Sequence, residues 1–397
     1  MVTLIGMGSG SWETLSVQAQ DAVRRAGLVF GAKRLLAGLP PECTARQFAL
    51  YQPAEILETL AQAPGQDAAV LYSGDTGFYS GASGLLTPLR ALGIPARVYP
   101  GVSSIQLLAA ALGRPWQDWK LVSAHGCACD PVAECMTERS VFFLTGGAET
   151  PATLCRKLAD AGMGEAHGVV GENLGTGEEA IRYGSAAELA GQSFAPLSVL
   201  LVENFDVPHF RTPGFPDESF IRGQVPMTKQ EVRAAALAKL AVKPADILWD
   251  VGAGTGSVSV ELALAAPKGR VYAVECDPDA CALIRQNRAK FQTYNLTLIE
   301  GRAPDALADL PAPDAVFIGG TKGGMEGVLD AVLAKNPDAR ICISAIALET
   351  PSAASALTAR GLAAEVVQLA VSRTKQAGRL HLLMANNPIF LITGIRK

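Results

Sequence analysis

Two glycine-rich turns could bring backbone amides close to a bound ligand. They cover residues 5–10 and 250–256, and each follows a short apolar run that is typical of a β-strand. Glycine has no Cβ atom, so the backbone can turn sharply and approach a ligand closely. The segments around the two turns do not otherwise resemble each other. The pattern therefore predicts two ligand-binding domains in one polypeptide.

The second turn has the spacing expected of a nucleoside-containing cofactor site. Its glycines are Gly252, Gly254 and Gly256, and Glu275 follows 19 residues later, at the end of the next predicted strand. An acidic side chain there can accept hydrogen bonds from ribose hydroxyls. The dinucleotide fingerprint G-x-G-x-x-G would need glycine at Ser257. The spacing favours S-adenosylmethionine (SAM) over a dinucleotide, and a tight strand–helix turn without a ligand is the remaining alternative.

Motifs around this turn make the second half similar to the decarboxylating precorrin methyltransferase family known as CbiT. They are residues 225–233, 301–304, 317–324, 344–350 and 387–388, and the resemblance spans about residues 222–397. It implies SAM contacts at Thr228, Gly252, Ala253, Gly254, Thr255, Gly256, Glu275 and Ala303. Gly319 and Gly320 should leave space for a bulky flat substrate. Carboxylates of that substrate should meet Arg302, Lys322 and Arg373, although each could instead be a solvated surface charge.

A different set of loops follows the first turn. No acidic residue ends the next predicted strand at a suitable distance, and distinctive loops occur instead at 72–81, 99–104, 123–126, 144–146, 150–151 and 171–175. These resemble the CbiE branch of the tetrapyrrole methylase superfamily over about residues 1–203. The resemblance implies SAM folded between two α/β lobes, with the first glycine turn beside the substrate. The implied SAM contacts are Gly74, Asp75, Ser103, Ser104 and Thr145, and the implied substrate contacts are Gly8, Gly10 and His125.

Local structural roles are open alternatives for several of these residues. Asp75 is of a type that forms turns by bonding its own backbone, and Ser103 or Ser104 could cap the helix that follows. A lone histidine such as His125 is commonly a hydrogen-bonded structural residue. The resembled family usually has arginine after this His-Gly pair, where the chain has Cys127. An anion-binding role is therefore not carried over to that position.

Together the two halves resemble the CobL family of decarboxylating precorrin-6Y C(5,15)-methyltransferases. The resemblance implies two SAM molecules, one per domain, that methylate precorrin-6Y at carbons 5 and 15. It also implies loss of the ring-C acetate carboxyl as carbon dioxide, giving precorrin-8 in cobalamin biosynthesis. The second domain should pair decarboxylation with carbon-15 methylation, and no general base is assigned. The alternatives are another SAM-dependent methyltransferase and a non-catalytic SAM-binding module.

The elements that must position these residues alternate between strand and helix, which predicts an α/β fold in both halves. The first half should be a bilobal tetrapyrrole methylase domain over residues 1–205, and the second a Rossmann-like, doubly wound, mainly parallel sheet over residues 226–397. Residues 206–225 have the proline and glycine content of a linker. We expect helices over 13–26 and 228–240, the latter with Thr228 as N-cap and Glu231 completing a capping box, and a terminal hairpin turning near 385–388.

Composition limits the other possibilities. The chain of 397 residues is 49% hydrophobic, which is enough to form two buried cores. Its net charge of −4 gives no indication of a polyanionic partner such as nucleic acid. No apolar run is long enough to cross a bilayer, and no signal peptide is evident. The eight cysteines follow no common zinc spacing, so no metal is expected. We expect a cytoplasmic protein that forms a homo-oligomer.

Overall fold

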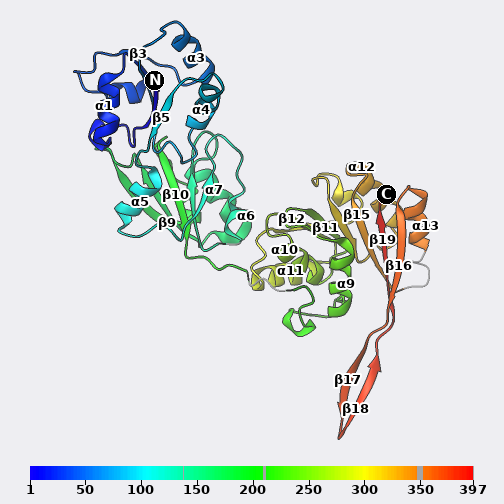
Figure 1. Ribbon diagram of the computed structural model, residues 1–397. Helices are drawn as coiled ribbons and strands as arrows, with labels where there is room; N and C mark the ends of the chain where they lie inside the picture. The colour runs from blue at the N-terminus through cyan, green and yellow to red at the C-terminus, as the bar shows by residue number, and fades with distance from the viewer. Residues whose placement is uncertain (137, 209–211, 347–351, 397) are drawn as a thin grey trace. The chain divides into compact units, whose positions relative to one another are not determined.

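The computed structural model describes residues 1–136, 138–208, 212–346 and 352–396 (Figure 1). It divides into two compact units. The first contains Met1–Asp130, Ser140–Asp160 and Gly164–Phe205, and the second contains Asp206–Lys397 with the short pieces Pro131–Arg139 and Ala161–Met163. No helix in the described ranges is long and apolar enough to span a membrane.

The first unit contains two five-stranded sheets. One is entirely parallel, in the order β3 (Arg46–Phe48), β2 (Leu28–Phe30), β4 (Ala68–Tyr72), β1 (Val2–Gly6) and β5 (Ala96–Tyr99). The other is mixed, in the order β6 (Lys120–Ser123), β7 (Ser140–Leu144), β10 (Ser198–Glu203), β8 (His167–Glu172) and β9 (Ala180–Ser185). The helices of this unit are α1 (Val17–Arg25), α2 (Lys33–Ala37), α3 (Pro53–Ala61), α4 (Ala82–Ala91), α5 (Ser104–Leu112), α7 (Pro151–Leu158) and α8 (Ala186–Leu189). Helix α6 (Pro131–Cys135) belongs to one of the short pieces of the second unit.

The second unit is built on a seven-stranded sheet. Its order is β13 (Leu296–Glu300), β12 (Arg270–Glu275), β11 (Ile247–Val251), β14 (Ala315–Ile318), β15 (Arg340–Ala345), β19 (Ile389–Ile395) and β16 (Ala363–Leu369). The first five strands are parallel, and β19 runs antiparallel between β15 and β16. The helices are α9 (Gln230–Leu240), α10 (Ser257–Ala265), α11 (Pro278–Lys290), α12 (Met325–Lys335) and α13 (Ser352–Ala359).

Side-chain alternation explains why helices cover both faces of this sheet. On β14, Ala315 and Phe317 belong to a core that includes residues of α9, α10 and α11, whereas Val316 and Ile318 belong to a core with α12 and α13. Successive side chains of a strand point to opposite faces, so both faces are apolar and each needs a helical layer. The predicted doubly wound, mainly parallel α/β fold is confirmed.

The predicted terminal hairpin is wrong. Strand β18 (Leu380–Ala385) pairs with β17 (Ser372–Ala377), a strand that the sequence analysis missed, and the pair extends away from the seven-stranded sheet (Figure 1). Strand β19 enters the sheet instead, because its residues 391–394 are buried and need partners on both edges. Residues 386–388 are therefore a connection, in which the Asn386 N–H donates to the Val371 carbonyl at 2.9 Å.

Two predicted helix starts are also wrong. The first helix begins at Val17 rather than at residue 13, because Ser16 accepts from the Ala19 N–H at 3.3 Å and a separate 3₁₀ turn occupies Trp12–Thr14. Helix α9 has Lys229, not Thr228, at its N-cap. Glu231 does not close a capping box there, since its carboxylate binds Arg373.

Part of the predicted linker belongs to the core of the second unit. Phe215 and Phe220 are buried against α9, α10 and α11. The Gly214 and Phe215 N–H groups donate to the buried Glu261 carboxylate at 2.6 and 3.1 Å. Irregular periodicity concealed this packing because the segment is held by side-chain carboxylates and two aromatic rings rather than by a regular element.

Candidate functional site

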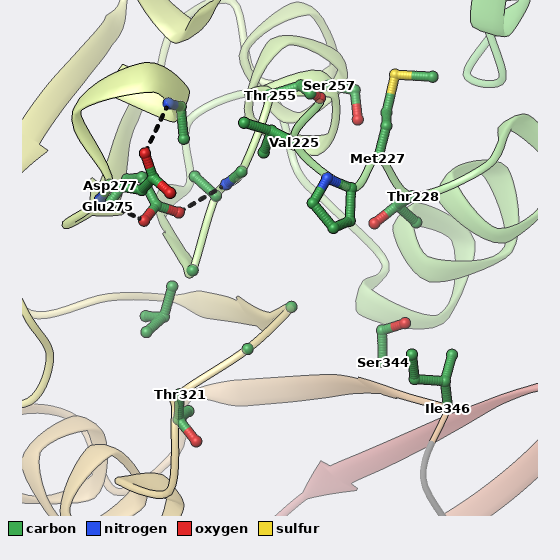
Figure 2. Close-up of a pocket in the computed structure, with 18 of the residues that line it drawn as sticks. Val225, Met227, Thr228, Thr255, Ser257, Glu275, Asp277, Thr321, Ser344 and Ile346 are labelled. Carbon is green, nitrogen blue, oxygen red and sulfur yellow. Dashed lines mark hydrogen bonds between the residues drawn. The ribbon is translucent and has the colours of Figure 1, made fainter. Parts of the chain in front are cut away.

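A cavity of about 550 Å³ lies in the second unit where the parallel strands end. Strand order reverses around β11, which has β12 on one side and β14 on the other, and ligands of open α/β sheets bind at such a switch point. The lining comes from the loops after β11, β12, β13, β14 and β15, from the segment before α9, and from the connection before β19. Figure 2 shows Glu275 and Asp277 at one end and Thr228, Ser344 and Ile346 at the other.

The structure brings most of the predicted second-domain site residues together in this cavity. Those that line it are Thr228, Gly252, Ala253, Gly254, Thr255, Glu275, Arg302, Ala303, Gly319, Gly320 and Lys322. Gly256 does not line it. It caps α10 with a φ of +75°, and a Cβ there would lie 3.0 Å from Ile284 Cγ1, so its role is close packing. Of the predicted motif at residues 344–350, residues 347–350 lie outside the described residues.

The glycine turn is shaped by a close approach between two loops. A Cβ on Gly252 would lie 2.2 Å from the Gly320 carbonyl oxygen, and Gly252 has a φ of +72°. A Cβ on Gly319 would lie 3.0 Å from the Gly252 carbonyl oxygen, whereas one on Gly320 would meet nothing within 4 Å. Only Gly320 therefore leaves the open space that was expected of the pair. Gly319 is required by the loop contact.

Glu275 organises the turn as well as facing the cavity. Its Oε2 accepts from the Gly254 N–H at 2.9 Å, and its Oε1 accepts from the Cys276 and Asp277 N–H groups at 2.7 and 2.9 Å. A carboxylate has about four lone-pair positions, so these bonds leave limited capacity for a ligand. Asp277 stands next to it with Oδ1 accepting from Asp279 and Ala280 at the N-cap of α11.

Several cavity residues were missed by sequence reasoning. Asp277 lines the cavity, and the Asp-Pro pair at a helix start was the signal that could have found it. Val225, Pro226, Met227 and Ser344 also line the cavity and lie within the motifs that resemble the CbiT family. Thr255, a predicted SAM contact, has a buried hydroxyl with no hydrogen-bond partner among the described residues. That hydroxyl is free to meet a polar ligand group.

A buried ionic network anchors the cavity wall before α9. The fully buried Arg233 guanidinium donates to Asp217 Oδ1 at 2.9 Å and to Glu261 Oε1 at 2.8 Å. It also donates to the carbonyl oxygens of Thr228 and Phe215. The network therefore ties the cavity-lining residue Thr228 to helices α9 and α10. Asp217 reaches Arg233 and Glu261 only because the predicted linker, residues 206–225, folds back onto the second unit.

The three predicted basic contacts have different surroundings. Arg302 and Lys322 line the cavity, and the Arg302 Nη2 donates to the Lys322 carbonyl at 3.1 Å. The Lys322 ammonium lies 3.6 Å from the Cys276 thiol, beside Glu275. Arg373 does not line the cavity. It forms an ion pair with Glu231, with Nη2 at 2.9 and 2.8 Å from the two carboxylate oxygens.

Asp250, beneath the turn, is fully buried and acts as a titratable group. Burial raises its pKa to about 7, against the opposing hydrogen bond from the Ser259 hydroxyl. Its Oδ1 has no partner among the described residues. Below about pH 7, the protonated acid is therefore the form that the folded unit favours.

We expect Asp250→Asn to remove a pH-dependent loss of stability. A raised folded-state pKa gives a contribution that is complete below the ordinary value of 3.8 and is lost as the pH rises through about 7. Between pH 5 and pH 8, the wild-type free energy of unfolding should fall relative to the variant by on the order of 3 kcal/mol. Urea titrations at both pH values measure this, with the exposed Asp305→Asn as control. A constant difference would contradict the assignment.

In the first unit, the glycine turn also marks a close approach of loops at the ends of parallel strands. A Cβ on Gly6 would lie 2.6 Å from the Gly101 nitrogen and 2.7 Å from the Gly74 carbonyl oxygen. Gly8 and Gly74 form a two-way backbone bridge, with N···O distances of 3.2 and 2.8 Å. Gly10 has a φ of +102° and packs beside α2. The predicted residues Gly8, Gly10 and Gly74 are thus neighbours on one edge of the sheet.

Asp75 connects these loops. Its Oδ1 accepts from the Gly77 N–H at 2.8 Å, and its Oδ2 accepts from the Gly101 N–H at 3.0 Å. Ser103 is the N-cap residue of α5, with its N–H donating to Gln106 Oε1 at 2.7 Å, and Ser104 is the first residue of that helix. The turn-forming alternative therefore describes a real contact of Asp75. The Ser103 hydroxyl is buried without a hydrogen-bond partner among the described residues, so it does not cap the helix through its side chain.

Thr145 and His125 meet on the other sheet of this unit. The buried Thr145 hydroxyl donates to the Ser198 carbonyl, and the Thr145 carbonyl lies 3.1 Å from His125 Nδ1. A Cβ on Gly146 would overlap the His125 ring, at 1.9 Å from Nδ1. The imidazole is thus fixed by backbone contacts, as in the structural alternative.

Known proteins are similar to this chain over both units. Residues 1–190 match the tetrapyrrole (corrin/porphyrin) methylases, and residues 219–395 match the precorrin methyltransferase domain. The precorrin-6Y C(5,15)-methyltransferase (decarboxylating) of Sinorhizobium sp is 33% identical over 338 residues, which are 84% of this chain and 81% of that protein. The protein of the same name from Mycobacterium tuberculosis (strain CDC 1551 / Oshkosh) is 30% identical, covering 89% of each chain.

A shorter relative shares about half of this chain. The probable cobalt-precorrin-6B C(15)-methyltransferase (decarboxylating) of Pyrobaculum calidifontis is 44% identical over 190 residues, which are 46% of this chain and 96% of that protein. These relatives are methyltransferases, which confirms the expected enzyme class and removes the dinucleotide alternative. The chain belongs to the family of decarboxylating precorrin-6Y C(5,15)-methyltransferases.

Proposed function

We propose that this chain transfers methyl groups from two SAM molecules to carbons 5 and 15 of precorrin-6Y and releases the ring-C acetate carboxyl as carbon dioxide. The product is precorrin-8, an intermediate of cobalamin biosynthesis. The observation that carries the proposal is the similarity to precorrin-6Y C(5,15)-methyltransferases over 84% and 89% of the chain, which includes both units. Each unit takes one SAM.

We assign carbon-15 methylation and decarboxylation to the second unit. A relative that matches 46% of this chain is itself named for both of these reactions. The precorrin methyltransferase match at residues 219–395 covers the second unit, where the cavity lies. Carbon-5 methylation is then left to the first unit, whose glycine turn and loops around Asp75 and Ser103 provide its site.

The residues of the second-unit cavity suit SAM. The acids Glu275 and Asp277 stand where ribose hydroxyls can donate, and the partnerless Thr255 hydroxyl can meet the polar amino-acid end. Ala303, at the end of β13, offers backbone groups to the adenine. When bound, SAM supplies an activated methyl group. The chain contributes positioning, which can lower the barrier by holding reacting atoms in line at near-attack distance.

The experiment that tests the proposal uses the full chain with precorrin-6Y and SAM carrying a ¹³C methyl group. We expect two labelled methyl groups in the product, on carbons 5 and 15, and one carbon dioxide for each product molecule. A single methyl group, or two methyl groups without carbon dioxide, would contradict it. Boiled protein is the control for spontaneous decarboxylation.

Glu275→Gln should weaken SAM binding at the second-unit site. In the wild type, backbone N–H groups donate to the Glu275 carboxylate. The glutamine variant places an NH₂ donor against some of these N–H groups, which weakens both the turn and the ribose contact. Hydrogen bonds to charged groups contribute about 1.5–3 kcal/mol, which predicts a Kd increase of about 10- to 100-fold. Calorimetric titration with SAM measures it. Glu300→Gln, at the end of the adjacent strand and exposed, is the matched control. If Glu275→Gln bound SAM at the second-unit site with wild-type affinity, Glu275 would not be a SAM ligand.

We also propose that the chain forms a homo-oligomer through the β17–β18 hairpin. Leu380, Leu382 and Met384 alternate along β18 and therefore share one face, and all are exposed. An isolated two-stranded hairpin has marginal stability in water, so burial against the same hairpin of a second copy would stabilise it.

Leu382→Lys should lower the molecular mass measured by light scattering, because a charged side chain would disrupt the contact between copies. The control is Thr374→Lys on the opposite face, and an unchanged mass for Leu382→Lys would exclude the hairpin as the contact.

A further inference from the structure

Lys229 is a cavity-lining cation that the known motifs leave without a role. It occupies the N-cap of α9, lines the second-unit cavity and is exposed. Its ammonium has no carboxylate partner within ion-pair distance among the described residues. Arg302 and Lys322, the other cavity cations, follow β13 and β14, and Lys322 lies against Cys276 directly after Glu275. Lys229 instead directly follows Thr228 in the chain, and Figure 2 shows Thr228 at the end of the cavity opposite Glu275.

Two acids beside the start of α9, Asp217 and Glu231, already pair with arginines. Glu231 is held by the Arg373 guanidinium, whose hydrogen bonds keep the pKa of that carboxyl below its usual range. Asp217 accepts from the Gln230 N–H and from Arg233 Nη1, both at 2.9 Å. These carboxylates are therefore committed to Arg373 and Arg233. The charge of Lys229 remains available to a ligand.

Neutral residues line the same cavity as Lys229. Met227, Leu369 and Val371 provide apolar surface, and Asn386 and Asn387 provide amide groups. The Asn386 N–H donates to the Val371 carbonyl, which fixes the connection that carries both asparagines. A cavity-lining ammonium without an ion-pair partner can attract an anionic group of a ligand.

We propose that Lys229 binds a carboxylate side chain of the tetrapyrrole, with the amides of Asn386 and Asn387 as neutral donors beside it. This assignment rests on the proposed function, since that substrate carries several carboxylates. An ammonium–carboxylate hydrogen bond is charge-assisted and stronger than a neutral one. Lys229 thus fixes the orientation of the macrocycle, while Glu275 and its neighbours at the other end hold the cofactor. Lys229 takes no part in bond making or breaking.

The test measures carbon dioxide release by the full chain against precorrin-6Y concentration. Lys229→Met should raise the KM for precorrin-6Y by about 10- to 100-fold, as expected for loss of a hydrogen bond between charged groups. The kcat and the Kd for SAM should change by less than about threefold, because no reacting atom or cofactor contact is removed. Lys229→Arg should restore most of the affinity. Lys239→Met, on the same helix and paired with Glu365, is the matched control.

The outcomes separate this inference from the proposed function. A Lys229→Met variant with an unchanged KM overturns the inference, and so does a loss confined to kcat or to SAM binding. An arginine variant as weak as the methionine variant also overturns it, because charge would not be the cause. A wild-type chain that binds SAM but releases no carbon dioxide overturns the proposed function itself.

Discussion

Gly252→Ala should abolish the reactions of the second unit and leave those of the first. The new methyl group would lie 2.2 Å from the Gly320 carbonyl oxygen, a contact that requires one of the two cavity loops to move. The residue would also be left-handed, at a φ of +72°, which costs about 1–2 kcal/mol for an L side chain. Misplacement by about 1 Å can lower a rate 100-fold. We therefore expect carbon-15 methylation and carbon dioxide release to fall by at least about 100-fold.

The measurement is ¹³C analysis of product methyl groups from the full-length variant, which reports both units in one reaction. Carbon-5 methylation should stay within about twofold of wild type, since our proposal assigns it to the first unit. Gly223→Ala is the control in the same unit, because its Cβ would make an ordinary 3.5 Å contact with Leu283. Normal carbon-15 methylation by Gly252→Ala would show that the glycine turn is not part of the site. Loss of both methylations would refute the division of labour.

Arg233→Met should destabilise the second unit more than any surface substitution. Removal of the guanidinium leaves Asp217 and Glu261 buried without their cation, and two carbonyl oxygens lose a donor. Breaking a buried ion pair in this way costs about 3–5 kcal/mol. SAM affinity should fall with it, because Thr228 and its neighbours in the cavity wall lose their anchor. Hydrogen-exchange mass spectrometry measures the opening of each unit by itself.

The control for this prediction is Arg285→Met. Arg285 also pairs with a glutamate, Glu300, but both side chains are more than half exposed, at 53% and 58%. An exposed pair contributes less than about 1 kcal/mol, so exchange in α9 and α10 should hardly change. If Arg233→Met left amide hydrogen exchange in α9 and α10 unaltered, the buried ionic network would not be what anchors the cavity wall before α9.

The sequence predicted well those features that depend on residues close together in the chain, such as strand bounds and the glycine turn. The sequence predicts strands over 247–251, 270–275, 315–318 and 389–395, and these are the bounds of β11, β12, β14 and β19, because buried strands are short apolar runs ended by turn residues. Glu275 and the glycine turn are near one another in any strand–turn–helix–strand unit, so their spacing was sufficient to place both in one cavity. Family resemblance added Thr228 and Ala303, which spacing alone would not have connected to that cavity.

Contacts between distant segments were not predictable in this way. Hydrophobic periodicity and glycine spacing act over a few residues, so the sequence was enough to predict two α/β units and the part of the second-unit cavity that contains Glu275 and the glycine turn. Three features became visible only in the folded chain: Gly252 requires Gly319, Glu231 binds Arg373, and Lys229 is left without an ion-pair partner among the described residues at the cavity. Charge compensation depends on which side chains meet after folding, and the ion pair of Arg373 with Asp217 joins residues 156 positions apart.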